Sequence, residues 1–208
     1  MFISFEGIDF CGKSTQVELL KIYLLKNNKR VEIIREPGGT EISEKVRTVL
    51  LDKKNNNMFM ETEIFLFSAS RAQLVREKIR PYLDEGIYVI SDRFHDSTTA
   101  YQGFGRGISP ESVEHINNLA VGSTVPDITF FIDIPVEEAE KRKQLKGKME
   151  LDRIEISDID FFKRVRRGYL FLARKEKRFR ILDGMLNEED LHKLVVKELA
   201  LLEKKELV

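Results

Sequence analysis

Short runs of apolar and β-branched residues alternate along this chain with longer segments whose apolar residues recur every three or four positions. Such short runs are typical of buried strands, and five of them lie at residues 2–5, 30–34, 87–91, 128–134 and 179–182. The longer segments predict amphipathic helices, as in the spacing of Val17, Leu20 and Leu24. This alternation predicts an α/β fold with a five-stranded, mainly parallel sheet and helices on both faces.

Glycine and proline fall between these segments, where turns need their backbone conformations. Pro37-Gly38-Gly39, Gly86 and Asp183-Gly184 each stand close to a predicted strand. No internal repeat, low-complexity tract or linker divides the sequence, and 208 residues are enough to bury one substantial core. We therefore expect a single domain over residues 1–208.

Composition narrows the class of protein. Hydrophobic residues make up 42% of the chain and charged residues 34%, values typical of a globular protein. The first residues lack the features of a signal peptide, and no apolar run approaches the roughly 18 residues that span a membrane. The single cysteine, Cys11, forms no internal disulfide, which favours a reducing compartment. We expect a cytoplasmic protein without a membrane partner.

Charge is balanced in total and uneven along the chain. The 35 basic and 35 acidic residues cancel, which argues against a uniformly basic coat for nucleic acid. Residues 141–180 nevertheless hold 15 basic and 6 acidic residues, a local charge of +9, against −9 for the rest. A solvated basic helix face is one interpretation of this segment, and a phosphate-handling surface is another.

The residues after the first predicted strand match G-x-x-x-x-G-K-S/T, the phosphate-binding P-loop. In such a loop, successive backbone N–H groups surround an anion, and the following helix adds the positive end of its dipole. Lys13 would reach the β and γ phosphates of a nucleoside triphosphate, and the Ser14 hydroxyl would hold magnesium. The expected nucleotide-binding residues are Gly7, Ile8, Asp9, Phe10, Cys11, Gly12, Lys13, Ser14 and Thr15.

A P-loop alone does not separate a small-molecule kinase from a switch GTPase, a motor or a DNA-associated ATPase. The N-K-x-D motif of guanine-specific switches is absent from the sequence. Seven further landmarks are Phe5-Glu6-Gly7-Ile8-Asp9, Arg35-Glu36-Pro37-Gly38-Gly39-Thr40, Phe67-Ser68-Ala69-Ser70-Arg71, Asp92-Arg93-Phe94 with Ser97, Ala100-Tyr101-Gln102-Gly103, Pro126-Asp127-Ile128-Thr129, and Asp152-Arg153-Ile154-Glu155 followed by Arg166, Gly168 and Tyr169. Through these landmarks the sequence resembles the bacterial thymidylate kinases, which are P-loop nucleoside monophosphate kinases, over nearly its whole length.

The resemblance implies a P-loop kinase fold and transfer of the γ-phosphoryl group of ATP, with Mg²⁺, to dTMP, giving dTDP for dTTP biosynthesis. It also implies a homodimer and no nucleic-acid partner. Because the acceptor is an ionised phosphate oxygen, the reaction needs positioning and cations and no strong general base.

The resemblance also implies a set of acceptor-binding residues. Phe67 resembles the ring that stacks on thymine, and Arg71, one helical turn later, resembles the donor to a base carbonyl. Asp9 resembles the carboxylate that binds the deoxyribose 3′-hydroxyl, and Tyr101 the residue that crowds the 2′ position. The remaining expected contacts are Gln102 near the base, Ser97, and Arg35 and Glu36 at the acceptor phosphate.

Arg93 is expected to neutralise charge between the donor and acceptor phosphates, and Asp92 to act through magnesium. Residues 141–152 resemble a lid that closes over ATP and excludes water. Lysine predominates at 141–148, where many members carry arginine, and lysine cannot grip a phosphate with two parallel hydrogen bonds. The candidate catalytic cations are Lys13, Arg93, Arg142, Lys146, Lys148 and Arg153.

Two P-loop residues depart from the small residues common in the family. We expect Phe10 to point away from the phosphates, into the acceptor or lid region. Cys11 stands close to a helix N-terminus, an environment that lowers a thiol pKa. Oxidation of Cys11 would then block ATP binding; the alternative is that its side chain fills a small, alanine-like space.

Two other functions stay open at this point. A deoxynucleoside kinase phosphorylates a sugar hydroxyl and needs a carboxylate base, a role that Glu36 could take. An ATP-binding regulatory or DNA-associated module would use the basic segment on nucleic acid, with strongly salt-dependent affinity.

Overall fold

The computed structural model describes residues 1–145 and 151–206. Its strands are β1 (Phe2–Glu6), β2 (Val31–Arg35), β3 (Tyr88–Asp92), β4 (Ile128–Asp133) and β5 (Phe179–Asp183). They form a sheet in the order β2-β3-β1-β4-β5, in which every pairing is parallel. The α/β class and the five-stranded sheet are confirmed, and each strand differs from its expected bounds by about one residue at an end.

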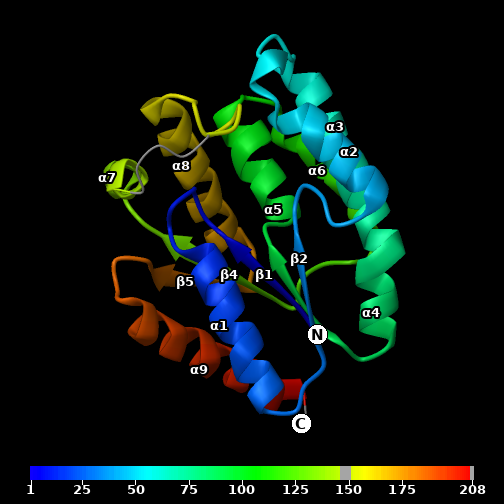
Figure 1. Cartoon of the computed structure of the whole chain (residues 1–208), viewed down its shortest axis with the longest axis vertical. Coiled ribbons are helices and arrows are strands. Elements are labelled where there is room, and N and C mark those ends of the chain that lie inside the picture. Colours follow the sequence, from blue (N-terminus) through cyan, green and yellow to red (C-terminus); the bar gives the residue numbers. More distant parts are fainter. Residues whose placement is uncertain (146–150, 207–208) are drawn as a thin grey trace.

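Helices cover both faces of this sheet (Figure 1). They are α1 (Lys13–Lys26), α2 (Glu41–Leu51), α3 (Met60–Leu74), α4 (Arg80–Asp84), α5 (His95–Thr98), α6 (Pro110–Val121), α7 (Val136–Leu145), α8 (Ile159–Lys175) and α9 (Glu188–Glu206). Three short turns join them: η1 (Lys53–Asn55), a 3-10 turn, and η2 (Val75–Ile79) and η3 (Thr99–Gly105), which have π-helical hydrogen bonding. No helix among the described residues is long and apolar enough to cross a membrane.

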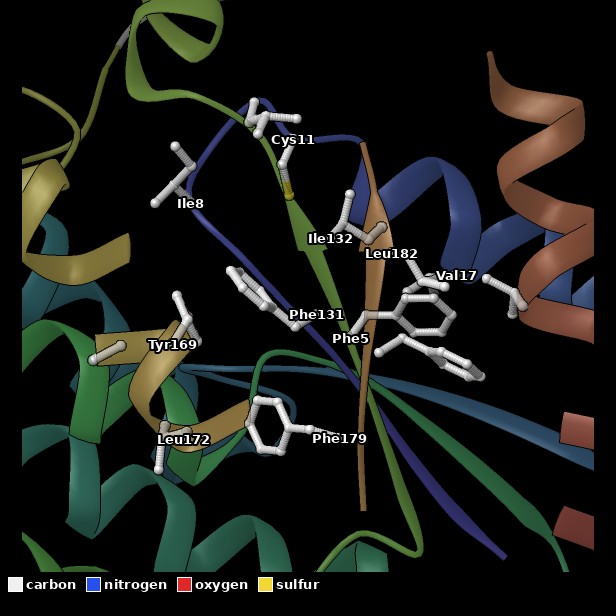
Figure 2. Packing of buried hydrophobic residues seen from close by; sticks show 14 of the residues in the cluster. Phe5, Ile8, Cys11, Val17, Phe131, Ile132, Tyr169, Leu172, Phe179 and Leu182 are labelled. Carbon is white, nitrogen blue, oxygen red and sulfur yellow. The ribbon is translucent and has the colours of Figure 1, made fainter. Parts of the chain in front are cut away.

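The core divides around the strands because successive side chains of a strand point to opposite faces. Phe5 of β1 packs with Phe130 of β4 and with Val17 of α1 on one face. On the other face, the ring of Phe131 stacks on Tyr169 of α8 at a centroid distance of 5.1 Å. Figure 2 shows Phe5 and Val17 on one side of the strands and Phe131 and Tyr169 on the other. Full burial of such side chains stabilises the fold by about 1.5–3 kcal/mol each.

Most long helices begin at a residue whose side chain accepts a hydrogen bond from the first turn. Thr40 caps α2 by accepting from the backbone N–H of Ser43, and Asp158 caps α8 by accepting from that of Phe161. Helix α1 differs, because it begins after Gly12, which has no side chain to offer. The first N–H groups of α1 are therefore left for another acceptor.

Candidate active site

A cavity of about 890 Å³ opens at the carboxyl edge of the sheet, the edge where open parallel sheets bind ligands. Residues that follow β1, β2 and β3 line it, together with side chains from α3, η3 and α7. The expected site residues that line the cavity are Asp9, Phe10, Gly12, Lys13, Ser14, Thr15, Arg35, Glu36, Phe67, Arg71, Asp92, Arg93, Ser97, Tyr101, Gln102 and Arg142. Segments far apart in the sequence thus meet at one place.

The P-loop connects the end of β1 to the start of α1, and its backbone surrounds a hollow, the phosphate cradle. Gly7 has a φ of 143°, and a Cβ there would lie 2.6 Å from the carbonyl oxygen of Ile132, so only glycine fits. Gly12 has a φ of 101°, and a Cβ there would meet open space. The uncapped N–H groups at the start of α1 therefore face an accessible hollow, which is the arrangement that binds phosphate.

Lys13 lies folded back along this loop. Its side chain is buried, and Nζ donates to the carbonyl oxygens of Gly7 and Ile8 at 3.0 Å each. The ammonium group is thus held inside the cradle, and the cavity reaches it.

Ser14 and Asp92 meet across the cavity floor, where the Ser14 hydroxyl donates to the Asp92 carboxylate at 2.7 Å. A hydroxyl and a carboxylate are oxygen ligands of the kind that Mg²⁺ accepts, with substrate phosphates and water supplying the rest. Among the described residues, no group of three or more His, Cys, Asp or Glu could hold a metal by itself. These two residues therefore fit a magnesium ion that arrives with a nucleotide.

Arg93 stands at the centre of the site in a strained left-handed conformation, with a φ of 73°. Its Nη2 lies 2.5 Å from the Asp9 carboxylate and donates to the Tyr101 hydroxyl at 3.0 Å. Its Nη1 donates to the Gly7 carbonyl at 2.9 Å and to the Tyr169 hydroxyl at 3.2 Å. The guanidinium is thus fixed between the P-loop and the residues expected to hold the acceptor.

The groups around Arg93 fix one another's protonation states. Burial by itself would raise the pKa of Asp9, but the positive charges of Arg93 and Lys13 hold it below its ordinary value. Burial raises the pKa of the Tyr101 phenol well above its usual range. Asp9 therefore stays a carboxylate and Tyr101 stays a neutral hydroxyl, at the place where we expect the deoxyribose of the acceptor.

The far end of the cavity carries Phe67 and Arg71 of α3. Phe67 is partly buried and lines the cavity, whereas Arg71 is 1% exposed. The Arg71 guanidinium donates to Glu36 at 2.7 Å and to the Thr98 hydroxyl at 2.8 Å. Arg71 therefore holds protein acceptors in this structure, while its position on the cavity wall leaves the expected base contact as a prediction.

Of the expected lid cations Arg142, Lys146 and Lys148, Arg142 lies within the residues that the structure describes. Arg142 of α7 lies over the P-loop, donating to the carbonyl oxygens of Gly184 at 2.9 Å and Phe10 at 3.5 Å. Lys146 and Lys148 lie outside the described residues. Phe10 lines the cavity and also a small crevice against α7, on the lid side.

Arg153 does not line the cavity, although it belongs to the same motif as Asp152 and Glu155, which do. It is 8% exposed, and its Nη2 lies 2.7 Å from the Glu63 carboxylate, while Nε donates to the carbonyl oxygen of Leu50. These contacts anchor the residue behind the cavity wall. This conformation does not present Arg153 as a phosphate ligand.

The expectation of an acidic thiol at Cys11 is wrong. Cys11 is 1% exposed, and burial raises the pKa of its thiol above the ordinary value despite the positive charges of Lys13 and Arg93. The sulfur packs into the hydrophobic core beneath the loop (Figure 2). Gly7, Ile8 and Cys11 shape the cradle from behind without lining the cavity.

Two residues to which the sequence gave no role lie in the cavity wall or behind it. Arg47 of α2 lies close to Arg35, at the end of the cavity where we expect the acceptor phosphate, and donates to the Pro37 carbonyl at 2.7 Å. Glu6 at the end of β1 lies behind Arg93, where its buried carboxylate accepts from the backbone N–H of Phe94 at 2.7 Å. In the sequence, Glu6 stood within the landmark Phe5-Glu6-Gly7-Ile8-Asp9, but nothing there gave it a role of its own.

The basic segment does not form a uniform cationic face among the described residues. Three of its arginines pair with carboxylates that lie outside the segment: Arg166 with Asp133, Arg180 with Glu198, and Arg178 with Asp96. The last of these pairs is almost fully buried. These ion pairs stabilise the fold and occupy part of the positive charge of residues 141–180. The interpretation of that whole segment as a phosphate-handling surface is therefore too broad.

The fold and the site define a P-loop kinase, with a phosphate cradle at the sheet edge and a ring of cations around one cavity. Comparison with known proteins agrees with this class. The thymidylate kinase family model matches residues 5–195. The chain therefore belongs to the thymidylate kinase family.

Individual relatives cover nearly the whole chain. A thymidylate kinase of Kosmotoga olearia is 50% identical over 206 residues, which span 99% of this chain and 98% of that one. A thymidylate kinase of Thermoanaerobacter sp. strain X514 is 50% identical over 196 residues, 94% of this chain and 95% of the relative. The crystal structure of thymidylate kinase from Ehrlichia chaffeensis superposes with a TM-score of 0.79 at 36% identity, covering 96% of this chain and 98% of that one.

Proposed function

We propose that this chain is an ATP-dependent dTMP kinase, which transfers the γ-phosphoryl group of ATP to the phosphate of dTMP and releases ADP and dTDP. The observation that carries the proposal is that one cavity is lined both by the P-loop and by Phe67, Tyr101 and Gln102, with Arg93 among its lining residues. The thymidylate kinase relatives support the same reaction.

In this proposal ATP lies along the P-loop. The free N–H groups at the start of α1 and the Lys13 ammonium bind its phosphates. Ser14 and Asp92 would hold a magnesium ion, which when bound neutralises charge on the β and γ phosphates. Arg142 lies over the loop from α7, where it can reach the nucleotide.

The acceptor lies on the other side of Arg93. Asp9 and Tyr101 meet the deoxyribose, because both line the cavity at one place, where the Tyr101 hydroxyl donates to the Asp9 carboxylate at 3.1 Å. Phe67 stacks on the base and Ser97 lines the wall beside it, while Arg35, together with Arg47, attracts the acceptor phosphate. Arg93 then contacts both phosphates and neutralises the charge that develops during transfer.

A test of acceptor class separates this reaction from phosphorylation of a nucleoside. ADP release is measured with MgATP and, in parallel, dTMP, dUMP, dCMP, dGMP or thymidine. We expect turnover with dTMP well above the other monophosphates and none with thymidine. Turnover with thymidine alone would contradict the proposal and would instead assign Glu36 as the base of a deoxynucleoside kinase.

We further propose that residues 141–152 act as a lid over ATP, with its first residues on α7 and with Arg153, which pairs with Glu63, directly after its end. Arg142, Lys146 and Lys148 are the candidate cations. Separate alanine substitutions of these three, measured for kcat at saturating substrates, identify which of them acts in transfer.

A homodimer is the proposed assembly. Phe65 on α3 and Leu119 on α6 are 60% and 81% exposed, and the two helices pack side by side (Figure 1). Such apolar side chains on adjacent helices favour contact with a second copy. Light scattering after size exclusion should give twice the chain mass for the unmodified protein and the single-chain mass for Leu119→Glu.

The cytoplasm is the proposed compartment, in keeping with one buried cysteine.

A further inference from the structure

Glu63 lies on α3 directly behind the part of the cavity wall that Gln102 forms. Its side chain is 2% exposed, and its carboxylate accepts from Gln102 Nε2 at 2.8 Å and from Arg106 Nε at 3.1 Å. The Nη2 of Arg153 lies 2.7 Å from the other carboxylate oxygen. Glu63 itself does not line the cavity.

This carboxylate stays ionised. Burial by itself would raise the pKa of Glu63, but the hydrogen bonds and charges of Arg106, Gln102 and Arg153 hold it below its ordinary value. A buried charge is stable only with such partners. At neutral pH, Glu63 is therefore an acceptor and never a donor.

An acceptor of this kind decides which way the Gln102 amide points. The NH₂ group must face Glu63, since an amide oxygen facing the carboxylate would be repelled by it and would find no donor there. The amide oxygen then lies on the opposite side of the group. In the described part of the chain, that oxygen accepts no hydrogen bond from the protein, and Gln102 lines the cavity.

We propose that Glu63 is a specificity-determining positioning residue, which fixes the Gln102 amide so that its oxygen accepts a hydrogen bond from N3–H of the pyrimidine base. The inference rests on the proposed function, in which Phe67 stacks on the base, and on the expectation that Gln102, which lines the same cavity, lies near that base. Thymine carries a hydrogen at N3, whereas cytosine carries a lone pair there. A fixed acceptor therefore selects dTMP over dCMP by leaving the wrong base with an unpaired group.

Glu63→Gln changes this orientation with little change in volume. The new side chain carries one oxygen and one NH₂ group, and the positive charges of Arg106 and Arg153 attract the oxygen to the side they share. The NH₂ group then faces Gln102, whose amide must turn and direct its own NH₂ group into the cavity. That donor matches N3 of cytosine and opposes N3–H of thymine.

The experiment measures kcat/KM for dTMP and for dCMP with MgATP in the unmodified enzyme and in Glu63→Gln. We expect the dTMP to dCMP ratio to fall by at least about tenfold in the variant. Glu85→Gln is the matched control, because the Glu85 carboxylate is 58% exposed and pairs with Arg30 on the surface. It should keep the ratio of the unmodified enzyme. An unchanged ratio in a folded Glu63→Gln would overturn the inference and leave the dTMP kinase proposal standing, whereas an unmodified enzyme inactive on dTMP would overturn the proposed function itself.

A double variant separates orientation of the amide from general damage to the site. In a Gln102→Ala background, adding Glu63→Gln should lower the ratio no further, because the amide that it turns is gone. An equal further fall would show that Glu63 acts elsewhere and would overturn the inference.

If Glu63→Gln does not fold, NMR of the unmodified enzyme with dTMP bound provides the test. The Gln102 side-chain NH₂, assigned by its loss in Gln102→Ala, should be protected from exchange, and rapid exchange would overturn the inference.

Discussion

The Arg93 guanidinium lies 2.5 Å from the Asp9 carboxylate, and this ion pair joins the end of β3 to the P-loop. Arg93 is a non-glycine residue with a φ of 73°, so the chain tolerates a strained backbone at the point where donor and acceptor meet. Its other contacts include the Tyr101 and Tyr169 hydroxyls. The guanidinium is thus oriented by groups of the protein itself.

Arg93→Lys should lower kcat by about 100-fold or more while the fold is retained. Lysine keeps the charge but cannot reproduce the planar group that reaches Asp9, Gly7 and the two tyrosines together. Initial rates at saturating ATP and dTMP measure the effect, with circular dichroism as the check on folding. A kcat within threefold of the unmodified enzyme would contradict a role in transfer.

Lys13→Ala should abolish most phosphoryl transfer, with kcat falling by roughly 10²–10³-fold. The buried Nζ is held by two P-loop carbonyls, so the charge is placed in the cradle at little entropic cost during the reaction. Lys26→Ala, at the exposed end of the same helix, is the control and should keep the rate of the unmodified enzyme. Comparable rates for the two variants would argue against the assignment of Lys13.

Much of the fold could be predicted because its signals are local. Apolar runs located the five strands, and the spacing of Gly7, Gly12 and Lys13 located the cradle at the end of β1. The π-helical turn η3, which brings Tyr101 and Gln102 to the cavity, had no such signal. Its conformation depends on packing against α8, which lies more than fifty residues later in the chain.

The site could be predicted less completely, because long-range pairing decides what a charged residue does. Arg153 stands in the same motif as Asp152, yet its partner Glu63 lies on α3 and turns it away from the cavity. The dipole argument for Cys11 considered the helix and omitted the burial of the thiol, which outweighs it. Neither effect is visible in neighbouring residues of the sequence.

Arg71→Ala should lower both dTMP affinity and stability. Removing the guanidinium leaves the buried Glu36 carboxylate without its counter-charge, which costs about 3–5 kcal/mol of unfolding free energy. Glu36→Gln added to Arg71→Ala should restore part of that stability, as measured by urea unfolding, while the dTMP KM stays high. A normal KM in this double variant would show that Arg71 supports the fold without contacting the base.

Peroxide should leave the enzyme active. The thiolate is the form that oxidises. Because burial raises the pKa of the Cys11 thiol, little thiolate is present, and because the side chain is buried, peroxide has little access to it. Mass spectrometry should show slow labelling of the folded protein by iodoacetamide and rapid labelling after denaturation. Rapid loss of activity that tracks oxidation of Cys11 would support the earlier redox hypothesis instead.

Glu6, a carboxyl beside the site, should titrate near neutral pH. Burial, with a smaller contribution from the negative charge of Asp96, raises its pKa to about 7, although Ser97, Arg93 and Phe94 oppose the shift. Its carboxylate accepts from the Ser97 hydroxyl at 2.6 Å and from the Tyr169 hydroxyl at 3.0 Å. Both hydroxyls in turn accept from Arg93, so the charge on Glu6 orients the groups that hold the guanidinium.

Lowering the pH through 7 should therefore reduce kcat in the unmodified enzyme, and Glu6→Gln should remove that part of the pH dependence. The raised pKa means that the carboxylate exists above about pH 7 and is lost below it, when a proton occupies an oxygen that Ser97 or Tyr169 needs. Substrate phosphates also titrate near pH 6, but equally in both enzymes, so the difference between the two profiles reports Glu6. The measurement is kcat at saturating ATP and dTMP from pH 5.5 to 9. Superimposable profiles would mean that protonation of Glu6 does not reach Arg93, and that the Asp9 ion pair alone is enough to hold the guanidinium in place.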